Sequence, residues 1–129
     1  LLGLSGVSND VRDISEAIDQ GNAEAQLAVD VLIDSIRHWA GSFFFKMGGA
    51  EAIAFTAGIG ENRADFRSAV CSGLEELGVR IDPEANAGMI RGVEGIISYP
   101  DSAIRVMVIP ANEELVVARE VYRKIQSLQ

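Results

Sequence analysis

The sequence predicts an α/β fold in which parallel strands alternate with helices. Two apolar segments typical of strands, "AIAFTA" at 52–57 and "IRVMVIPA" at 104–111, each run directly into a segment typical of a helix. Because a helix between two strands returns the chain to the same end of the sheet, such strands pair in parallel. The chain has 129 residues, of which 48% are hydrophobic, so we treat residues 1–129 as a single domain or part-domain.

Two helices are expected before the first strand. The first lies in "SNDVRDISEAIDQG" at 8–21, with Ser8, Asn9 or Asp10 as its N-cap and Gly21 at its end. Asn22 is the expected N-cap of a second, long helix that continues to residue 47. Its apolar stripe consists of Leu27, Val31, Ile36, Trp39 and Phe43.

The segment after the first strand predicts one helix over 61–78, with Phe66, Val70 and Leu74 facing inward. Shorter strands are expected at 79–82 and 95–99. Asn112 is the expected N-cap of the final helix. The strand at 52–57 is apolar on both faces, which is typical of a central strand buried between helices.

Charge and composition argue against several classes of partner. The chain has 19 acidic and 11 basic residues and a formal net charge of −8, which disfavours binding to nucleic acid. No apolar run reaches the roughly 18 residues of a membrane span. Cys71 is the only cysteine and cannot form an internal disulfide, and one cysteine with one histidine is too few for a metal cage of those ligands. We expect a cytoplasmic protein with neither nucleic acid nor membrane among its partners.

The turn after the first long strand has features of a nucleotide site. Ligands of parallel α/β sheets bind beyond the carboxyl ends of the strands. In "AGIGEN" at 57–62, Gly58 and Gly60 permit positive φ and let a ligand approach the backbone closely, and the helix that follows presents free N–H groups. Taken alone, a GxG turn after a strand is common in α/β proteins of many functions.

The turn after the second long strand carries acidic residues that could serve a metal ion. Glu113 and Glu114 fall in the first turn of the final helix. A magnesium ion bound with a nucleotide takes one or two carboxylates and keeps several waters, so either residue is a candidate ligand. The alternative is that both glutamates only complement the helix dipole. A redox domain of the Rossmann type is a weaker alternative, because the turn lacks the later glycine of GxGxxG.

Four segments together resemble the C-terminal part of the acetate kinase family, in order and spacing. They cover almost the whole chain: "LLGLSGVSNDVRDI" at 1–14, "FTAGIGEN" at 55–62 with Arg67 downstream, "LGVRIDPEAN" at 77–86, and "VIPANEELVVARE" at 108–120. The resemblance implies part of an actin-like, sugar-kinase-like ATPase domain of the ribonuclease H-like type. It also implies an ATP:acetate phosphotransferase, with propionate or butyrate kinase as alternatives.

The resemblance implies roles for particular residues. The segment that contacts the nucleotide, ATP or ADP, would comprise Asp10, Val11 and Arg12. The loop that receives the adenosine would comprise Gly58, Ile59, Gly60, Glu61 and Asn62. Glu113 would occupy the position associated with Mg²⁺.

Similar enzymes are roughly three times as long as this chain, and their acyl-binding arginines, catalytic histidine and phosphate loops lie upstream of the matched segment. We therefore expect no catalytic residue in this chain and no activity from it alone, with the missing N-terminal part and a second copy in a homodimer as partners. The alternative from another class is a stand-alone, non-catalytic nucleotide-binding module.

Overall fold

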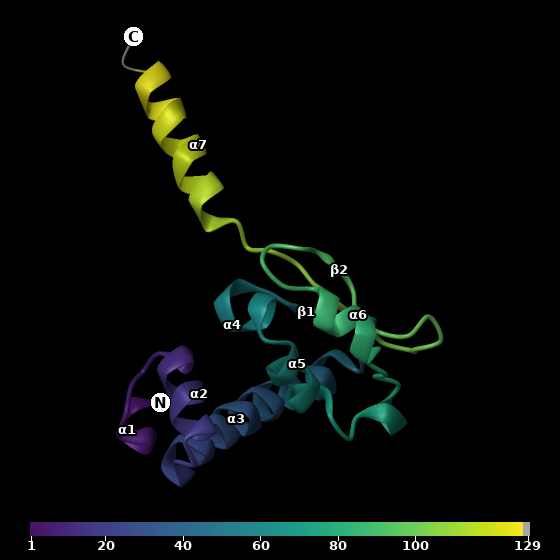
Figure 1. Ribbon diagram of the computed structural model, residues 1–129. Coiled ribbons are helices and arrows are strands. Elements are labelled where there is room, and N and C mark those ends of the chain that lie inside the picture. Colours follow the sequence, from purple (N-terminus) through teal and green to yellow (C-terminus); the bar gives the residue numbers. More distant parts are fainter. Residues whose placement is uncertain (128–129) are drawn as a thin grey trace.

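The computed structural model describes residues 1–127, and the side chain of Glu113 lies outside the described part. The fold combines helices with a small three-stranded sheet (Figure 1). The helices are α1 (Leu2–Ser5), α2 (Val11–Asp19), α3 (Ala23–Met47), α4 (Ala57–Asn62), α5 (Ala64–Cys71), the 3-10 helix η1 (Glu75–Leu77), α6 (Pro83–Gly88) and α7 (Glu113–Gln126). The strands are β1 (Ala52–Phe55), β2 (Gly95–Ile96) and β3 (Arg105–Val108).

The first two predicted helices begin where their capping residues indicate. The carboxylate of Asp10 accepts a hydrogen bond of 2.9 Å from the backbone N–H of Arg12 at the start of α2. The side chain of Asn22 accepts one of 2.9 Å from the N–H of Ala25 at the start of α3. These bonds satisfy donors that have no partner within the helix, so the local sequence determines both starts.

The sheet has the order β1-β3-β2. Strands β1 and β3 are parallel, with Ala52 opposite Arg105 and Phe55 opposite Val108, which confirms the predicted parallel pairing. Strand β2 is antiparallel to β3. The predicted strand at 79–82 is reduced to single bridges at Val79 and Ile81.

Strand β1 lies at an edge of the sheet, so the prediction that it is central and buried on both faces is wrong for this chain. Ala52 and Ala54 are exposed, whereas Ile53 and Phe55 pack against the core. The central strand is β3, whose Val106 and Val108 are fully buried. Within residues 1–127, one face of the sheet is therefore covered and the other is largely open.

The helix predicted over 61–78 is broken into shorter pieces. Arg63 is extended, with φ −117° and ψ 90°, and separates α4 from α5. Gly73 has φ +74°, a left-handed conformation that ends the helical path after Cys71. Phe66 and Val70 are buried as predicted, because α5 keeps its inward face despite its shorter length.

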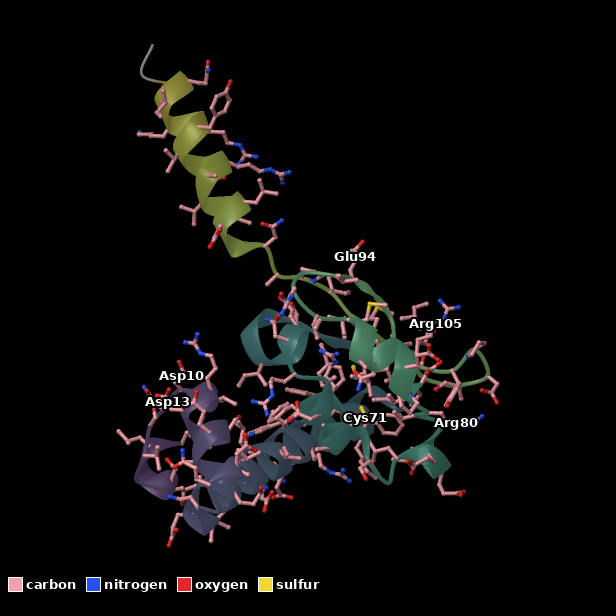
Figure 2. All side chains as sticks on the ribbon, in the orientation of Figure 1. Asp10, Asp13, Cys71, Arg80, Glu94 and Arg105 are labelled. Atoms are coloured by element: carbon pink, nitrogen blue, oxygen red, sulfur yellow. The ribbon has the colours of Figure 1, made fainter. Side chains whose placement is uncertain are left out.

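The core lies between the covered face of the sheet and helices α3 and α5. Its buried members are Cys71, Val79, Ile97, Ile104, Val106 and Val108. Phe44 of α3 and Phe55 of β1 pack against this cluster. Figure 2 labels Cys71, the last residue of α5.

Helix α3 has the predicted length, but most of its apolar stripe is exposed. Leu27, Val31, Trp39 and Phe43 are each about half exposed, and the fully buried residues of the helix are Ala25 and Ala28. No helix within residues 1–127, α3 included, is both long enough and apolar enough to cross a membrane.

Helix α7 extends away from the remainder of the structure (Figure 1). Its N-cap residue, Asn112, has φ +43° and makes no capping hydrogen bond with its side chain, so the predicted side-chain cap is wrong. The exposed large apolar residues of the helix are Leu115, Val116, Val117, Val121, Tyr122 and Ile125. Within residues 1–127 these side chains are left exposed, which is typical of an amphipathic helix that packs against a further apolar surface.

The buried thiol of Cys71 predicts a pH dependence of stability. Burial raises the pKa of Cys71 to about 11. A raised pKa in the folded chain contributes stability below the unfolded pKa of roughly 8.5, and this contribution is lost as the pH rises through the folded pKa. We expect the free energy of unfolding to fall by on the order of 2 kcal/mol over this interval because of Cys71.

Urea denaturation at several pH values between roughly 8.5 and 11 measures this loss. Cys71→Ala is the matched control, because it removes the thiol and leaves every lysine and tyrosine to titrate. Parallel pH profiles of the two proteins would contradict the prediction.

Candidate functional site

The turns that follow β1 and β3 lie together at the carboxyl ends of these two strands. The backbone N–H of Ile109 donates to the carbonyl of Phe55 at 2.9 Å. Beyond the ends of the two strands, the N–H of Ala111 in the second turn donates to Glu61 Oε1 in the first turn at 2.7 Å. These bonds confirm that the two turns border the same region of the structure.

The backbone of the first turn does not use the positive φ that its two glycines permit. Gly58 and Gly60 belong to the short helix α4 and have no positive φ; the left-handed residue is Ala57, with φ +59°. A Cβ atom added to Gly60 would lie 3.4 Å from the carbonyl carbon of Phe55, so a small residue is needed there for contact with the end of β1. A Cβ atom added to Gly58 would meet nothing within 4 Å, so the space in front of Gly58 is open to a ligand.

The side chains of Glu61 and Asn62 shape the turn by bonding to its surroundings. Glu61 holds the backbone of Ala111 through its carboxylate. Asn62 Nδ2 donates to the carbonyl of Gly58 at 2.9 Å, and Asn62 Oδ1 accepts from the N–H of Arg91 at 3.1 Å. Two of the five predicted adenosine-loop residues therefore have structural contacts that define the loop.

Arg67 holds the same turn from inside the structure, although no sequence pattern assigned it a role. Its side chain is fully buried. The guanidinium donates to the carbonyl of Gly60 at 2.8 Å, to Asn86 Oδ1 and the carbonyl of Asn86 at 2.7 Å each, and to the carbonyl of Met89 at 2.8 Å. Burial lowers the pKa of Arg67 below its ordinary value.

A signal for the burial of Arg67 was present in the sequence. It lies four residues before Cys71 on the same helix, so both residues share one helix face. The predicted inward residues Phe66 and Val70 are the neighbours of these two positions, and the prediction did not include Arg67 among them. A buried arginine needs several acceptors, and backbone carbonyls supply most of them here, which no sequence pattern marks.

Arg63 joins the turn to helix α2. Its guanidinium donates to Asp65 at 2.9 and 2.6 Å and to Ser15 Oγ at 2.6 Å. The hydrogen bond with Asp65 raises the pKa of Arg63 and lowers that of Asp65. Helix α2, which carries the predicted segment 10–12, is thereby attached to the region around the turn.

The predicted nucleotide-contacting residues 10–12 form the start of α2. Asp10 and Arg12 pair with each other at 2.6 Å, and the Arg12 side chain is 87% exposed. The hydrogen bond with Arg12 lowers the pKa of the Asp10 carboxyl to about 2. Figure 2 shows Asp10 at the surface of α2. Val11 is half-buried.

The predicted metal residue, Glu113, is the first residue of α7, and its side chain lies outside the described part of the structure. Its neighbour Glu114 is exposed. Among the residues that the structure describes, no group of three or more His, Cys, Asp or Glu side chains could hold a metal ion. The assignment of Glu113 stays a prediction.

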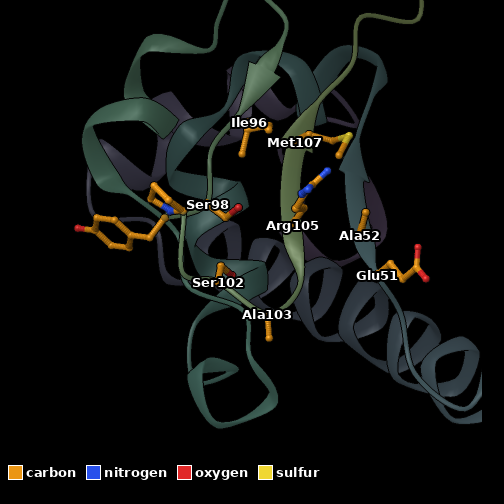
Figure 3. Close-up of a pocket in the computed structure, with 10 residues that line it drawn as sticks. Glu51, Ala52, Ile96, Ser98, Ser102, Ala103, Arg105 and Met107 are labelled. Carbon is orange, nitrogen blue, oxygen red and sulfur yellow. The ribbon is translucent and has the colours of Figure 1, made fainter.

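A hollow of about 490 Å³ lies elsewhere, over the open face of the sheet (Figure 3). It is lined by Glu51, Ala52, Ile96, Arg105 and Met107, among others. Glu51, Ala52 and Arg105 lie where β1 and β3 begin, which is the end of the sheet opposite the two turns. The hollow is therefore separate from the predicted nucleotide site and lies on the uncovered face of the sheet.

Comparison with known proteins gives matches over nearly the whole chain. The family model of the acetokinase family matches residues 1–119. The chain is 49% identical over 121 residues to acetate kinase from Staphylococcus aureus strain JH9, covering 94% of this chain and 30% of that protein.

Two solved structures share the fold. The crystal structure of Porphyromonas gingivalis acetate kinase matches with a TM-score of 0.83 and 39% identity, covering 92% of this chain and 30% of that one. The crystal structure of a propionate kinase from Francisella tularensis matches with a TM-score of 0.77 and 34% identity, covering 92% and 29% respectively. The chain thus spans about a third of the length of these relatives.

The match at the family level agrees with the motifs, with the parallel pair of strands and with the two adjoining turns. The mixed α/β structure is that of acetate kinases, mostly helical around a small sheet. The chain belongs to the acetokinase family.

Proposed function

We propose that this chain forms the nucleotide side of the cleft in an enzyme that transfers a phosphoryl group between ATP and acetate. The observation that carries the proposal is the turn after β1, which is fixed by bonds from three directions and has open space in front of Gly58. Membership of the acetokinase family supports the reaction class. Propionate is the alternative acceptor, supported by the similarity to a propionate kinase, and butyrate is a further alternative.

Within this proposal the turn 58–62 receives the adenosine, and the exposed Arg12 beside Asp10 contacts the nucleotide from α2. The Arg12 side chain is free to reorient, because its pairing with Asp10 is exposed to solvent and such pairs are weak. Glu113 is the proposed carboxylate near Mg²⁺.

Magnesium neutralises charge on the transferred phosphoryl group when it is bound. A magnesium ion that arrives with the nucleotide takes only one or two protein carboxylates, and Glu113 is the residue proposed to supply one. The residues of this chain would then orient the nucleotide.

The groups that bind acetate and perform the transfer are proposed to lie upstream, in the part of the family that this chain does not span. Phosphoryl transfer depends on positioning both substrates and on neutralising charge, so one side of a cleft is insufficient. We further propose a cytoplasmic homodimer as the working form.

The exposed apolar surface argues against the alternative of a stand-alone nucleotide-binding module. A self-sufficient domain of this size covers most of its large apolar side chains. Here the apolar residues of α7 and much of the stripe on α3 are exposed. Such surfaces are typical of a part that packs against further protein.

The first prediction concerns the open space at Gly58. Gly58→Val places a branched side chain where the nucleotide would lie, without a clash inside the protein. We expect ADP affinity to fall by about tenfold or more, with the thermal midpoint nearly unchanged. Calorimetric titration of the chain with ADP, in parallel with thermal unfolding, measures both.

Gly60→Val is the informative comparison, because its side chain would press on Phe55 and destabilise the fold as well as weaken binding. Wild-type affinity in both valine variants would show that the nucleotide binds elsewhere.

The second prediction separates a metal-associated role of Glu113 from a helix-dipole role. The test uses a chimera in which this chain replaces the matching 30% of the Staphylococcus aureus enzyme. We expect Glu113→Ala to lower kcat by about a hundredfold or more and Glu114→Ala to have little effect, because the proposal associates only the Glu113 carboxylate with the ion. The measurement is turnover as a function of magnesium concentration. Equal and mild losses in the two variants would favour the dipole.

The third prediction concerns the chain by itself. Because apolar faces of α3 and α7 are exposed, we expect the isolated 129 residues to self-associate and to show no acetate kinase activity. Light scattering and an assay coupled to ADP release are the two measurements. A monodisperse monomer that converts acetate and ATP unaided would overturn the proposed division of the site.

A further inference from the structure

We propose that Arg67 is a positioning residue for the nucleotide: from inside the protein it fixes the turn 58–62 in the geometry that receives the adenosine. This inference rests on the proposed function and extends it to a residue that does not touch the ligand.

The contacts of Arg67 connect three segments of the chain. One NH₂ group reaches the carbonyl of Gly60, in the middle of the turn, at 2.8 Å. The other reaches the carbonyls of Asn86 and Met89 at the end of α6, and Nε reaches Asn86 Oδ1. Asn86 is itself held, because its Nδ2 donates to the carbonyl of Ala64 at 2.8 Å and to Ser68 Oγ at 2.9 Å. Gly60 is thus tied to α6 through one rigid planar group.

The charge of Arg67 argues for a role beyond cohesion. In the described part of the chain its hydrogen-bond partners are neutral oxygens, and none is a carboxylate. Burying a cation costs free energy, and apolar side chains of similar volume often hold two helices together as well as or better than buried charged groups do. An apolar side chain, however, cannot orient the carbonyl of Gly60.

Arg67 is connected to the proposed nucleotide site through a single residue, Gly60. Gly60 lies between Gly58, which faces open space, and Glu61, which bonds to the backbone of Ala111. A shift at Gly60 therefore displaces the surface proposed to meet the adenosine. The acyl substrate is proposed to bind to the other side of the cleft, outside this chain. Loss of Arg67 should consequently affect the nucleotide far more than acetate.

Arg67→Lys is the sharpest variant. Lysine keeps the positive charge but is a single ammonium on a flexible stem, so it cannot span Gly60, Asn86 and Met89 in one plane. The substitution isolates the geometry of the guanidinium from its charge.

Arg37→Lys is the matched control. Arg37 also binds backbone carbonyls, those of Ala69, Val70 and Ser72, at 3.3, 3.2 and 2.7 Å. It joins α3 to the end of α5 and makes no contact with the turn in the described structure. A purely structural arginine of this kind should alter stability without altering substrate selectivity.

The experiment compares the chimera with its Arg67→Lys and Arg37→Lys variants at a temperature at which circular dichroism shows all three folded. We measure KM for ATP and for acetate, ADP affinity by calorimetry, and the thermal midpoint. Arg67→Lys should raise the KM for ATP and the Kd for ADP about tenfold, with the acetate KM within about twofold of the parent value. Arg37→Lys should lower the thermal midpoint and leave both KM values unchanged.

Asn86→Ala carries the test if Arg67→Lys fails to fold. It removes the partner of Nε and leaves the guanidinium bonds to Gly60 and Met89, so it should raise the KM for ATP by a smaller factor. Unchanged nucleotide constants in the folded variants, with stability reduced as in Arg37→Lys, would overturn the positioning role. Absence of ADP binding in the parent chimera would instead overturn the proposed function itself, and the positioning role with it.

Discussion

Within residues 1–127, a buried guanidinium that has no carboxylate among its hydrogen-bond partners connects the parts of the structure that matter for function. Arg67 satisfies its donors with oxygens from α4, α6 and the segment after α6. Two of these four bonds are buried and two are partly buried, and a buried polar group without a partner costs free energy, as a buried charge does. The arginine and its acceptors therefore require one another, and the turn after β1 has its shape because both are present.

The sheet provides the second constraint, because it places two turns that are distant in sequence beside each other. Parallel pairing of β1 with β3 brings their carboxyl ends to the same edge, and the bond from Ala111 to Glu61 joins the two turns beyond those ends. Only one face of this sheet is covered by the chain's own helices. The open face of the sheet, the stripe on α3 and the apolar residues of α7 are all exposed in the described structure. The turn after β1 is therefore fully formed, whereas much of the apolar surface around it is not covered.

The sequence predicted where the candidate site lies better than how its backbone is built. The position of the turn, the parallel strands and the caps at Asp10 and Asn22 follow from local patterns and are confirmed. Gly58 and Gly60 permit positive φ, and neither adopts it. Glycine permits positive φ but does not require it. At Gly60 the close approach of Phe55 explains why the residue is small. The left-handed conformation in this turn is adopted by Ala57.

Local hydrogen bonding and periodicity act within a few residues, so the sequence by itself determined the starts of α2 and α3, the positions of β1 and β3, and the family of this protein. Burial depends on the elements that pack against each segment, and only the tertiary structure decided it. It left the apolar stripe of α3 largely exposed and made β1 an edge strand. It also placed the side chain of Arg67 in the interior, against the carbonyls of Gly60, Asn86 and Met89. Carbonyls are common to all residues, so their convergence on one arginine arises only when distant segments are folded together.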